Sequence, residues 1–156
     1  MRLLFLLLAL TVSRTATSQP AVERVPLIGD WQLNRARTHY GPGVDQRHRE
    51  RFTCAARGAR VACTIRGERA DGRVVIGRFT AALNGTGAPV TGVPGIDEVR
   101  LRAGGAAVTD ATFLRRGVPV FGYRAYRSED GRSLMIVAVD PISRAARSTV
   151  VVYDRR

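Results

Sequence analysis

Residues 51–66 read Arg-Phe-Thr-Cys-Ala-Ala-Arg-Gly-Ala-Arg-Val-Ala-Cys-Thr-Ile-Arg, and this stretch decides the fold class. Apolar and polar side chains alternate on both sides of Gly58-Ala59, which is the period of a half-buried strand. A two-residue turn at Gly58-Ala59 joins the two runs into an antiparallel hairpin. Arg51 and Arg66 then fall on the outer face. The predicted inner face holds Phe52, Cys54, Ala56, Val61, Cys63 and Ile65.

The same register pairs the two cysteines of the chain. Counting outward from the Gly58-Ala59 turn places Cys54 directly opposite Cys63. Alternation makes this a non-hydrogen-bonded pair, whose Cα atoms lie about 4.5 Å apart, a separation that a disulfide accepts. We therefore predict a Cys54–Cys63 disulfide inside the sheet, which indicates an oxidising compartment.

Turn signals recur along the rest of the chain at nearly regular intervals. They are Asp71-Gly72, Asn84-Gly85, Gly104-Gly105, Arg116-Gly117, Asp130-Gly131 and the segment 140–146. No stretch between them has a convincing helical period. We expect strands at 29–33, 48–57, 60–68, 73–83, 97–102, 106–115, 118–127, 132–139 and 147–154.

Consecutive hairpins of this kind form an antiparallel up-and-down meander. Long strands leave two exposed edges unless the sheet closes on itself. The sequence therefore predicts an all-β, lipocalin-like barrel of about eight to ten strands, with a two-sheet β-sandwich as the alternative. Residues 84–97 are rich in glycine and proline and are expected to form an ordered loop or the opening of the barrel.

The first residues are typical of a secretory signal peptide. Arg2 is followed by an apolar run from Leu3 to Val12 and by small residues up to Ser18. We expect residues 1–18 to be removed and residues 19–156 to form one domain with no integral membrane segment. The predicted location is the periplasm or the extracellular space.

The chain is strongly basic, with a formal net charge of +12, and all 25 basic residues are arginine. A composition rich in arginine, alanine and glycine and free of lysine is typical of a GC-rich genome, so the charge is weak evidence for a polyanion partner. We expect the arginines to form a solvated surface, no nucleic-acid partner and a monomer.

The segment Gly29-Asp-Trp-Gln-Leu-Asn34 carries a resemblance. With residues 89–94, 97–101, 128–134 and 152–154, it resembles a family of uncharacterised secreted bacterial proteins that begin with G-x-W-x-L-N and look lipocalin-like. The resemblance implies export and a barrel fold. Its opening is also similar to the first strand of lipocalins and fatty-acid-binding proteins, whose carboxylate-binding R-x-Y ending is missing here because Val151 precedes Tyr153 by two residues.

Motifs for catalysis or metal binding do not stand out. His39 and His48 lack cysteine or carboxylate partners at zinc-ligand spacing, and the common hydrolase, metalloprotease and nucleotide-binding signatures are missing. We therefore expect no enzyme activity, no catalytic residues, no metal and no cofactor. Trp31, the one tryptophan, is expected to pack the floor of the barrel.

Two arginines are candidates for a ligand site. A two-residue turn at Asp71-Gly72 places Arg78 opposite Ile65, on the inner face. A two-residue turn at Asp130-Gly131 places Arg124 opposite Val137. A buried arginine needs an anion, water or an open mouth, so these side chains either bind an acidic head group or extend to the rim. The candidate ligand-binding set is Arg78, Arg124, Tyr126 and Phe113.

Either face of the strands around Arg124 could point into the barrel, because the face opposite Arg124 is also apolar. That opposite face holds Phe121, Tyr123, Leu134 and Ile136, and Asp110 is expected to face Tyr123 there.

Two function hypotheses follow from these observations. The first is an exported binding module whose barrel takes an apolar or acidic amphiphilic small molecule. The second is an envelope or secreted interaction factor, chaperone-like or inhibitory, that uses loop 84–97 or an arginine-rich face. An interior cavity favours the first, and a packed interior beside a large apolar patch favours the second.

Overall fold

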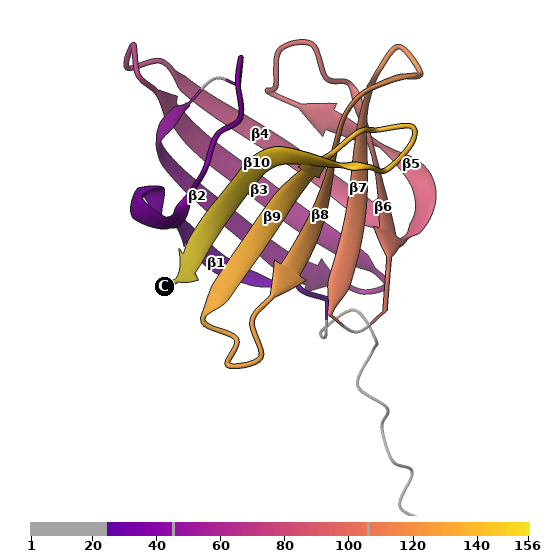
Figure 1. Cartoon of the computed structure of the whole chain (residues 1–156). Helices are drawn as coiled ribbons and strands as arrows, with labels where there is room; N and C mark the ends of the chain where they lie inside the picture. Colours follow the sequence, from indigo (N-terminus) through magenta and orange to yellow (C-terminus); the bar gives the residue numbers. More distant parts are fainter. Residues whose placement is uncertain (1–24, 45, 106) are drawn as a thin grey trace, which may run out of the picture.

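A computed structural model describes residues 25–44, 46–105 and 107–156, and its strands form one closed barrel (Figure 1). The predicted signal peptide, residues 1–18, lies outside the described residues. A short 3₁₀ turn, η2 (Arg35–Arg37), follows the first strand. The strands are β1 (Gly29–Leu33), β2 (Arg47–Arg57), β3 (Arg60–Arg69), β4 (Val74–Ala82), β5 (Asn84–Thr91), β6 (Glu98–Ala103), β7 (Val108–Arg115), β8 (Val118–Arg127), β9 (Ser133–Val139) and β10 (Ala146–Arg155).

The topology is an up-and-down meander. Each strand pairs with the next, and β1 closes the ring by pairing with both β2 and β10. All pairs are antiparallel. Because the ring of strands is closed, the prediction of an all-β closed barrel is confirmed and the sandwich alternative is not adopted. Among the described residues, no helix has the length and apolar character needed to cross a membrane.

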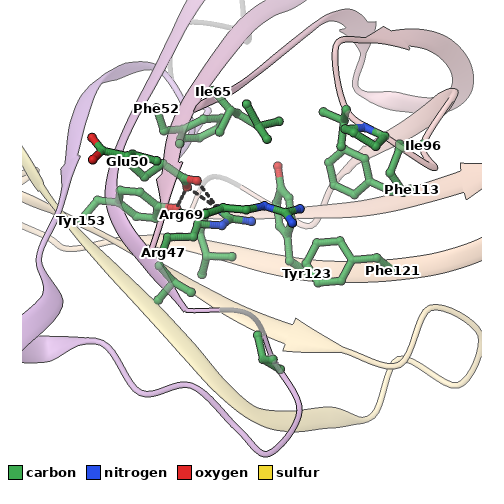
Figure 2. Close-up of a pocket in the computed structure, with 18 residues that line it drawn as sticks. Arg47, Glu50, Phe52, Ile65, Arg69, Ile96, Phe113, Phe121, Tyr123 and Tyr153 are labelled. Carbon is green, nitrogen blue, oxygen red and sulfur yellow. Dashed lines mark hydrogen bonds and ion pairs between the residues drawn. The ribbon is translucent and has the colours of Figure 1, made fainter. Parts of the chain in front are cut away.

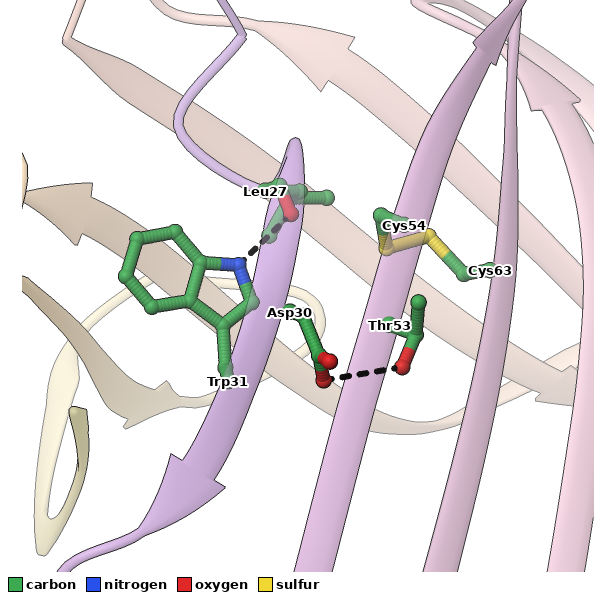
Figure 3. The surroundings of a disulfide bond; sticks show 6 residues. All are labelled: Leu27, Asp30, Trp31, Thr53, Cys54 and Cys63. Carbon is green, nitrogen blue, oxygen red and sulfur yellow. Dashed lines mark hydrogen bonds between the residues drawn. A yellow bond between two sulfur atoms is a disulfide. The ribbon is translucent and has the colours of Figure 1, made fainter. Parts of the chain in front are cut away.

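The β2–β3 hairpin has the predicted register throughout its central part. Phe52 faces Ile65, and Cys54 faces Cys63. A disulfide joins the two cysteines, whose Cα atoms lie 4.2 Å apart (Figure 3). The predicted inner face is also confirmed, because Phe52 and Val61 are buried while Arg51 and Arg66 are exposed. Turn length and alternation were sufficient here because nothing interrupts the ladder between the turn and Arg49.

One end of the barrel is filled by its first residues. Trp31 and Leu27 are completely buried, and the indole N–H of Trp31 donates a hydrogen bond of 2.9 Å to the carbonyl of Leu27 (Figure 3). Gly29 pairs with Cys54, so the disulfide lies at the same end as this plug. The expectation that Trp31 packs the floor is confirmed.

The β3–β4 hairpin differs from its prediction by one residue. The loop holds three residues, 70–72: the amide of Arg69 donates to the carbonyl of Arg73, and Gly72 has a φ of +79°. This is the three-residue hairpin with a left-handed glycine, which Asp-Gly sequences also favour. Arg78 therefore pairs with Thr64 instead of Ile65 and is exposed on the outer face. A slip of one residue reverses every side chain of a strand, so the prediction that Arg78 points inward was wrong.

A bulge changes the register between β7 and β8. It lies between Phe113 and Leu114, and it places Asp110 opposite Arg124 rather than Tyr123. Arg124 does pair with Val137, as predicted across the Asp130-Gly131 turn. The inward face, however, is the competing one, with Tyr123 buried. The prediction that Arg124 points into the barrel was therefore wrong.

The segment 84–97 is only partly a loop. Residues Asn84–Thr91 form β5, which pairs with β4 through Phe79 and Val90 and with β6 through Ala88 and Val99. The strand was not predicted because the segment is rich in glycine and the side chains on its inner face are small. Ala88 and Val90 are buried there, while Pro89 is exposed. Residues 92–97 form the connection to β6.

Candidate functional site

The barrel contains a cavity of about 330 Å³ (Figure 2). It lies toward the end where β2 begins and β3 ends, and residues of the 92–97 connection line it. Most of its wall is apolar. The lining apart from charged and glycine residues is Val44, Phe52, Ile65, Val75, Val93, Pro94, Ile96, Phe113, Phe121, Tyr123, Ile136, Val151 and Tyr153.

Aromatic rings form one side of this cavity. Phe113 on β7 lies at the centre of the group, with ring centroids 5.6 Å from Tyr123, 5.7 Å from Phe121 and 6.2 Å from Phe79. These separations are typical of favourable tilted and edge-to-face aromatic pairs. The group fixes the side-chain positions of β7 and β8 and gives the cavity a firm apolar wall.

A polar cluster lies on the side of β2 and β10. Glu50 is 3% exposed, and its carboxylate accepts hydrogen bonds from the hydroxyl of Tyr153 and from the guanidinium of Arg47 (Figure 2). Gly67 stands opposite Glu50 on β3, and a Cβ atom there would lie 2.9 Å from the carboxylate. The glycine therefore leaves the space that the buried carboxylate occupies.

Burial and charge set the protonation of Tyr153. Removal from water raises its pKa well above the usual value, and the negative charge of Glu50 acts in the same direction. Tyr153 therefore keeps its proton and donates a hydrogen bond to Glu50. The side chain of Arg47 is 43% exposed, so the ion pair runs from the buried carboxylate to solvent. The buried charge of Glu50 is thus satisfied by Tyr153 and by Arg47.

Tyr123 contributes a different polar group. It is 4% exposed, it lines the cavity, and its hydroxyl has no hydrogen-bond partner among the described residues (Figure 2). Burial raises the pKa of Tyr123, with a further contribution from Glu50, so the hydroxyl stays protonated. A protonated hydroxyl inside an apolar cavity is a hydrogen-bond donor that lacks an acceptor.

Of the four candidate ligand residues, the structure brings only Phe113 to the cavity. Arg78 and Arg124 lie on the outer face for the register reasons given above, and Tyr126 pairs there with the exposed Met135. The predicted site residues did not include Arg47, Glu50 and Tyr153, which line the cavity, and Tyr123 was placed only on the competing apolar face. Extending the confirmed alternation from Phe52 by two residues would have identified Glu50.

The outer face carries an arginine-rich cluster around Asp110. Arg124 and Arg144 each donate to this carboxylate, at 2.9 and 2.7 Å. Partial burial would raise the pKa of Asp110, but the two guanidinium groups outweigh it and lower the pKa below the usual value. Arg102 pairs with Asp110 in the β6–β7 ladder. Arg100 joins Arg102, Asp110 and Arg144 in lining a surface pocket. Arg100 forms an ion pair with Glu98, so four arginines stand against two acids in this cluster.

Metal binding has no evident place in this arrangement. In the part of the chain that the structure describes, no group of three or more His, Cys, Asp or Glu side chains could hold a metal ion.

Comparisons of the chain with protein-family models, with curated proteins and with solved structures found no match. The fold agrees with the lipocalin-like architecture that the sequence resemblance implies, and the chemistry has to be inferred from the cavity itself.

Proposed function

We propose that this protein is an exported binding module that holds a small apolar or amphiphilic molecule inside its barrel. The observation that carries the proposal is the cavity of about 330 Å³ with apolar walls and a buried polar cluster. Ligand sites of proteins are concave, mostly apolar and furnished with a few placed polar groups, and their volumes begin near 300 Å³. The proposal involves no catalytic step.

The size of the cavity limits the ligand. At roughly 30 Å³ for each non-hydrogen atom, which is the share of a water molecule in the liquid, the cavity accepts about eleven such atoms. A benzene ring with a four-carbon chain has this size. The acidic head group predicted from the sequence rested on inward positions of Arg78 and Arg124, and both lie on the outer face.

Export and family membership are further parts of the proposal. The Cys54–Cys63 disulfide supports an oxidising compartment, since disulfides persist in secreted and periplasmic proteins. The ten-strand barrel supports membership of the lipocalin-like group of secreted bacterial proteins.

The alternative function, an interaction factor, has one observation in its favour. The cluster of Arg100, Arg102, Arg124 and Arg144 around Asp110 gives the outer sheet a positive region that suits an acidic partner. The interior cavity favours the binding module, because a barrel that acts only through its surface needs no unfilled core.

Titration calorimetry with butylbenzene tests the proposal. The wild type is expected to bind it. Ile65→Trp, which enlarges a cavity-lining side chain, should weaken binding at least tenfold. Thr64→Trp is the matched control, because Thr64 is the neighbouring residue on the opposite face of β3 and should leave the affinity within about twofold. No binding by the wild type, or equal weakening by the two variants, would contradict a ligand site inside the barrel.

A further inference from the structure

The Tyr123 hydroxyl is a polar group of the cavity that has no hydrogen-bond partner among the described residues. Burying a hydroxyl without a partner is unfavourable, because it gives up its hydrogen bonds to water. Tyr153, the other buried tyrosine of the cavity, is bound to Glu50. Tyr123 has no such partner among the described residues. This difference indicates that the acceptor for its hydroxyl is supplied by the molecule that occupies the cavity.

Among the described residues, the charges that line the cavity cancel formally. They are those of two arginines, Arg47 and Arg69, and two glutamates, Glu50 and Glu68. The carboxylate of Glu50 is the one that Arg47 and Tyr153 hold in the interior. An acidic ligand that reached this cluster would lie beside Glu50 and be repelled by it.

We propose that the cavity selects a neutral apolar molecule with one oxygen acceptor, such as a ketone, ester or ether, and that Tyr123 donates the hydrogen bond to it. This inference rests on the function proposed above. Phe113 and Phe121 pack beside Tyr123, at 5.6 and 6.2 Å between centroids, so the acceptor would lie next to an aromatic wall that suits an apolar body. The negative charge of Glu50 disfavours a free carboxylate in its immediate neighbourhood.

Three probes of ten to twelve non-hydrogen atoms test this selection: butylbenzene, butyrophenone and phenylbutanoate with its carboxylate at the chain end. They share a phenyl ring and a four-carbon chain and differ in the oxygen group. The quantity to measure at pH 7 is the Kd ratio of butylbenzene to butyrophenone. Tyr123→Phe should lower this ratio about fivefold, the equivalent of one net hydrogen bond. In the wild type, phenylbutanoate should bind at least tenfold more weakly than butyrophenone.

Tyr40→Phe is the matched control. The Tyr40 hydroxyl is also buried, but it does not line the cavity. The same chemical change at this position should leave the Kd ratio unchanged. Tyr123→Phe removes only an oxygen that bonds to no described residue, so the variant is expected to fold, which circular dichroism would check.

The outcomes separate this inference from the function on which it rests. A ratio that falls in Tyr123→Phe and not in Tyr40→Phe, with weak binding of phenylbutanoate, supports the selection. A ratio unchanged in Tyr123→Phe, or phenylbutanoate as the tightest ligand, overturns the selection while butylbenzene binding retains the proposed function. Failure of all three probes to bind the wild type overturns both.

Discussion

The hydroxyl of Tyr153 donates a hydrogen bond to the carboxylate of Glu50 inside the barrel. The two residues belong to β10 and β2, which are the neighbours of β1 on its two sides. Their bond therefore crosses behind β1 and joins the last strand to the second at the point where the barrel closes. Because Glu50 is 3% exposed, losing a partner there leaves a buried charge less well satisfied.

The two buried tyrosines of the cavity should respond differently to removal of the hydroxyl. Tyr153→Phe is expected to lower the free energy of unfolding by about 1–3 kcal/mol, because Glu50 loses a donor in the interior. Tyr123→Phe should leave it unchanged or raise it, since that hydroxyl has no partner among the described residues. Urea unfolding of the two variants gives both values. A larger loss for Tyr123→Phe than for Tyr153→Phe would contradict the hydrogen-bond assignment.

Stability should fall at alkaline pH through the same two residues. The pKa values of Tyr123 and Tyr153 are raised in the folded protein, mainly by burial. A raised folded pKa means that stability is complete below the unfolded value of about 10 and is lost as the pH rises above it. At pH 11, each tyrosine should account for roughly 1 kcal/mol of the loss relative to pH 8.

Urea unfolding at the two pH values measures this loss. Tyr153→Phe and Tyr123→Phe each lack one of the titrating groups, so the loss in each variant should be smaller than in the wild type. The absorbance at 295 nm should show these tyrosines ionising only as the protein unfolds. Equal losses in the wild type and both variants would rule out their contribution.

How far the sequence could predict the fold depended on the turns. The Gly58-Ala59 hairpin was predictable because a two-residue turn and an unbroken ladder carry the register to Cys54 and Cys63. Asp71-Gly72 fits both a two-residue and a three-residue loop, and the choice reverses the face of Arg78. The pattern of residues does not distinguish the two loops, because the same dipeptide serves both.

The site was less accessible to prediction than the fold. The bulge between Phe113 and Leu114 shifts the register of β7 against β8, and no turn residue in the sequence marks its position. The cavity depends on which side chains fail to meet across the interior, and local alternation carries no such information. Glu50 was the exception, since alternation alone places it two residues before Phe52 on the inner face.

The close approach of Gly29 to Trp31 should make this glycine hard to replace. Gly29 has a φ of +151°, and a Cβ atom there would lie 2.8 Å from the indole ring. Trp31 is completely buried and cannot swing away. Gly29→Ala is expected to lower the free energy of unfolding by about 3 kcal/mol or more, the sum of backbone strain and overpacking.

Gly58→Ala is the control for this prediction. Gly58 also has a positive φ, +58°, but a Cβ atom there meets nothing within 4 Å. It should cost only the backbone strain, about 1–2 kcal/mol. Urea unfolding followed by the fluorescence of Trp31 measures both variants. If the two substitutions cost the same, the contact with Trp31 yields more easily than the structure indicates.

Reduction of the Cys54–Cys63 disulfide should lower stability without opening the barrel. The bond connects residues nine apart in the sequence, and closing so short a loop reduces the entropy of the unfolded chain by an amount worth roughly 2–3 kcal/mol. The folded ladder on both sides of the pair is continuous, with Phe52 opposite Ile65 and Ala56 opposite Val61, so the native strands stay paired when the bond is cut. The urea midpoint of the wild type should therefore fall on addition of a reductant, while the far-ultraviolet circular dichroism before unfolding stays the same.

The double variant Cys54→Ala, Cys63→Ala is the control, and its midpoint should be insensitive to the reductant. A wild-type midpoint that does not move would show that the bond adds nothing to a hairpin already fixed by its own register.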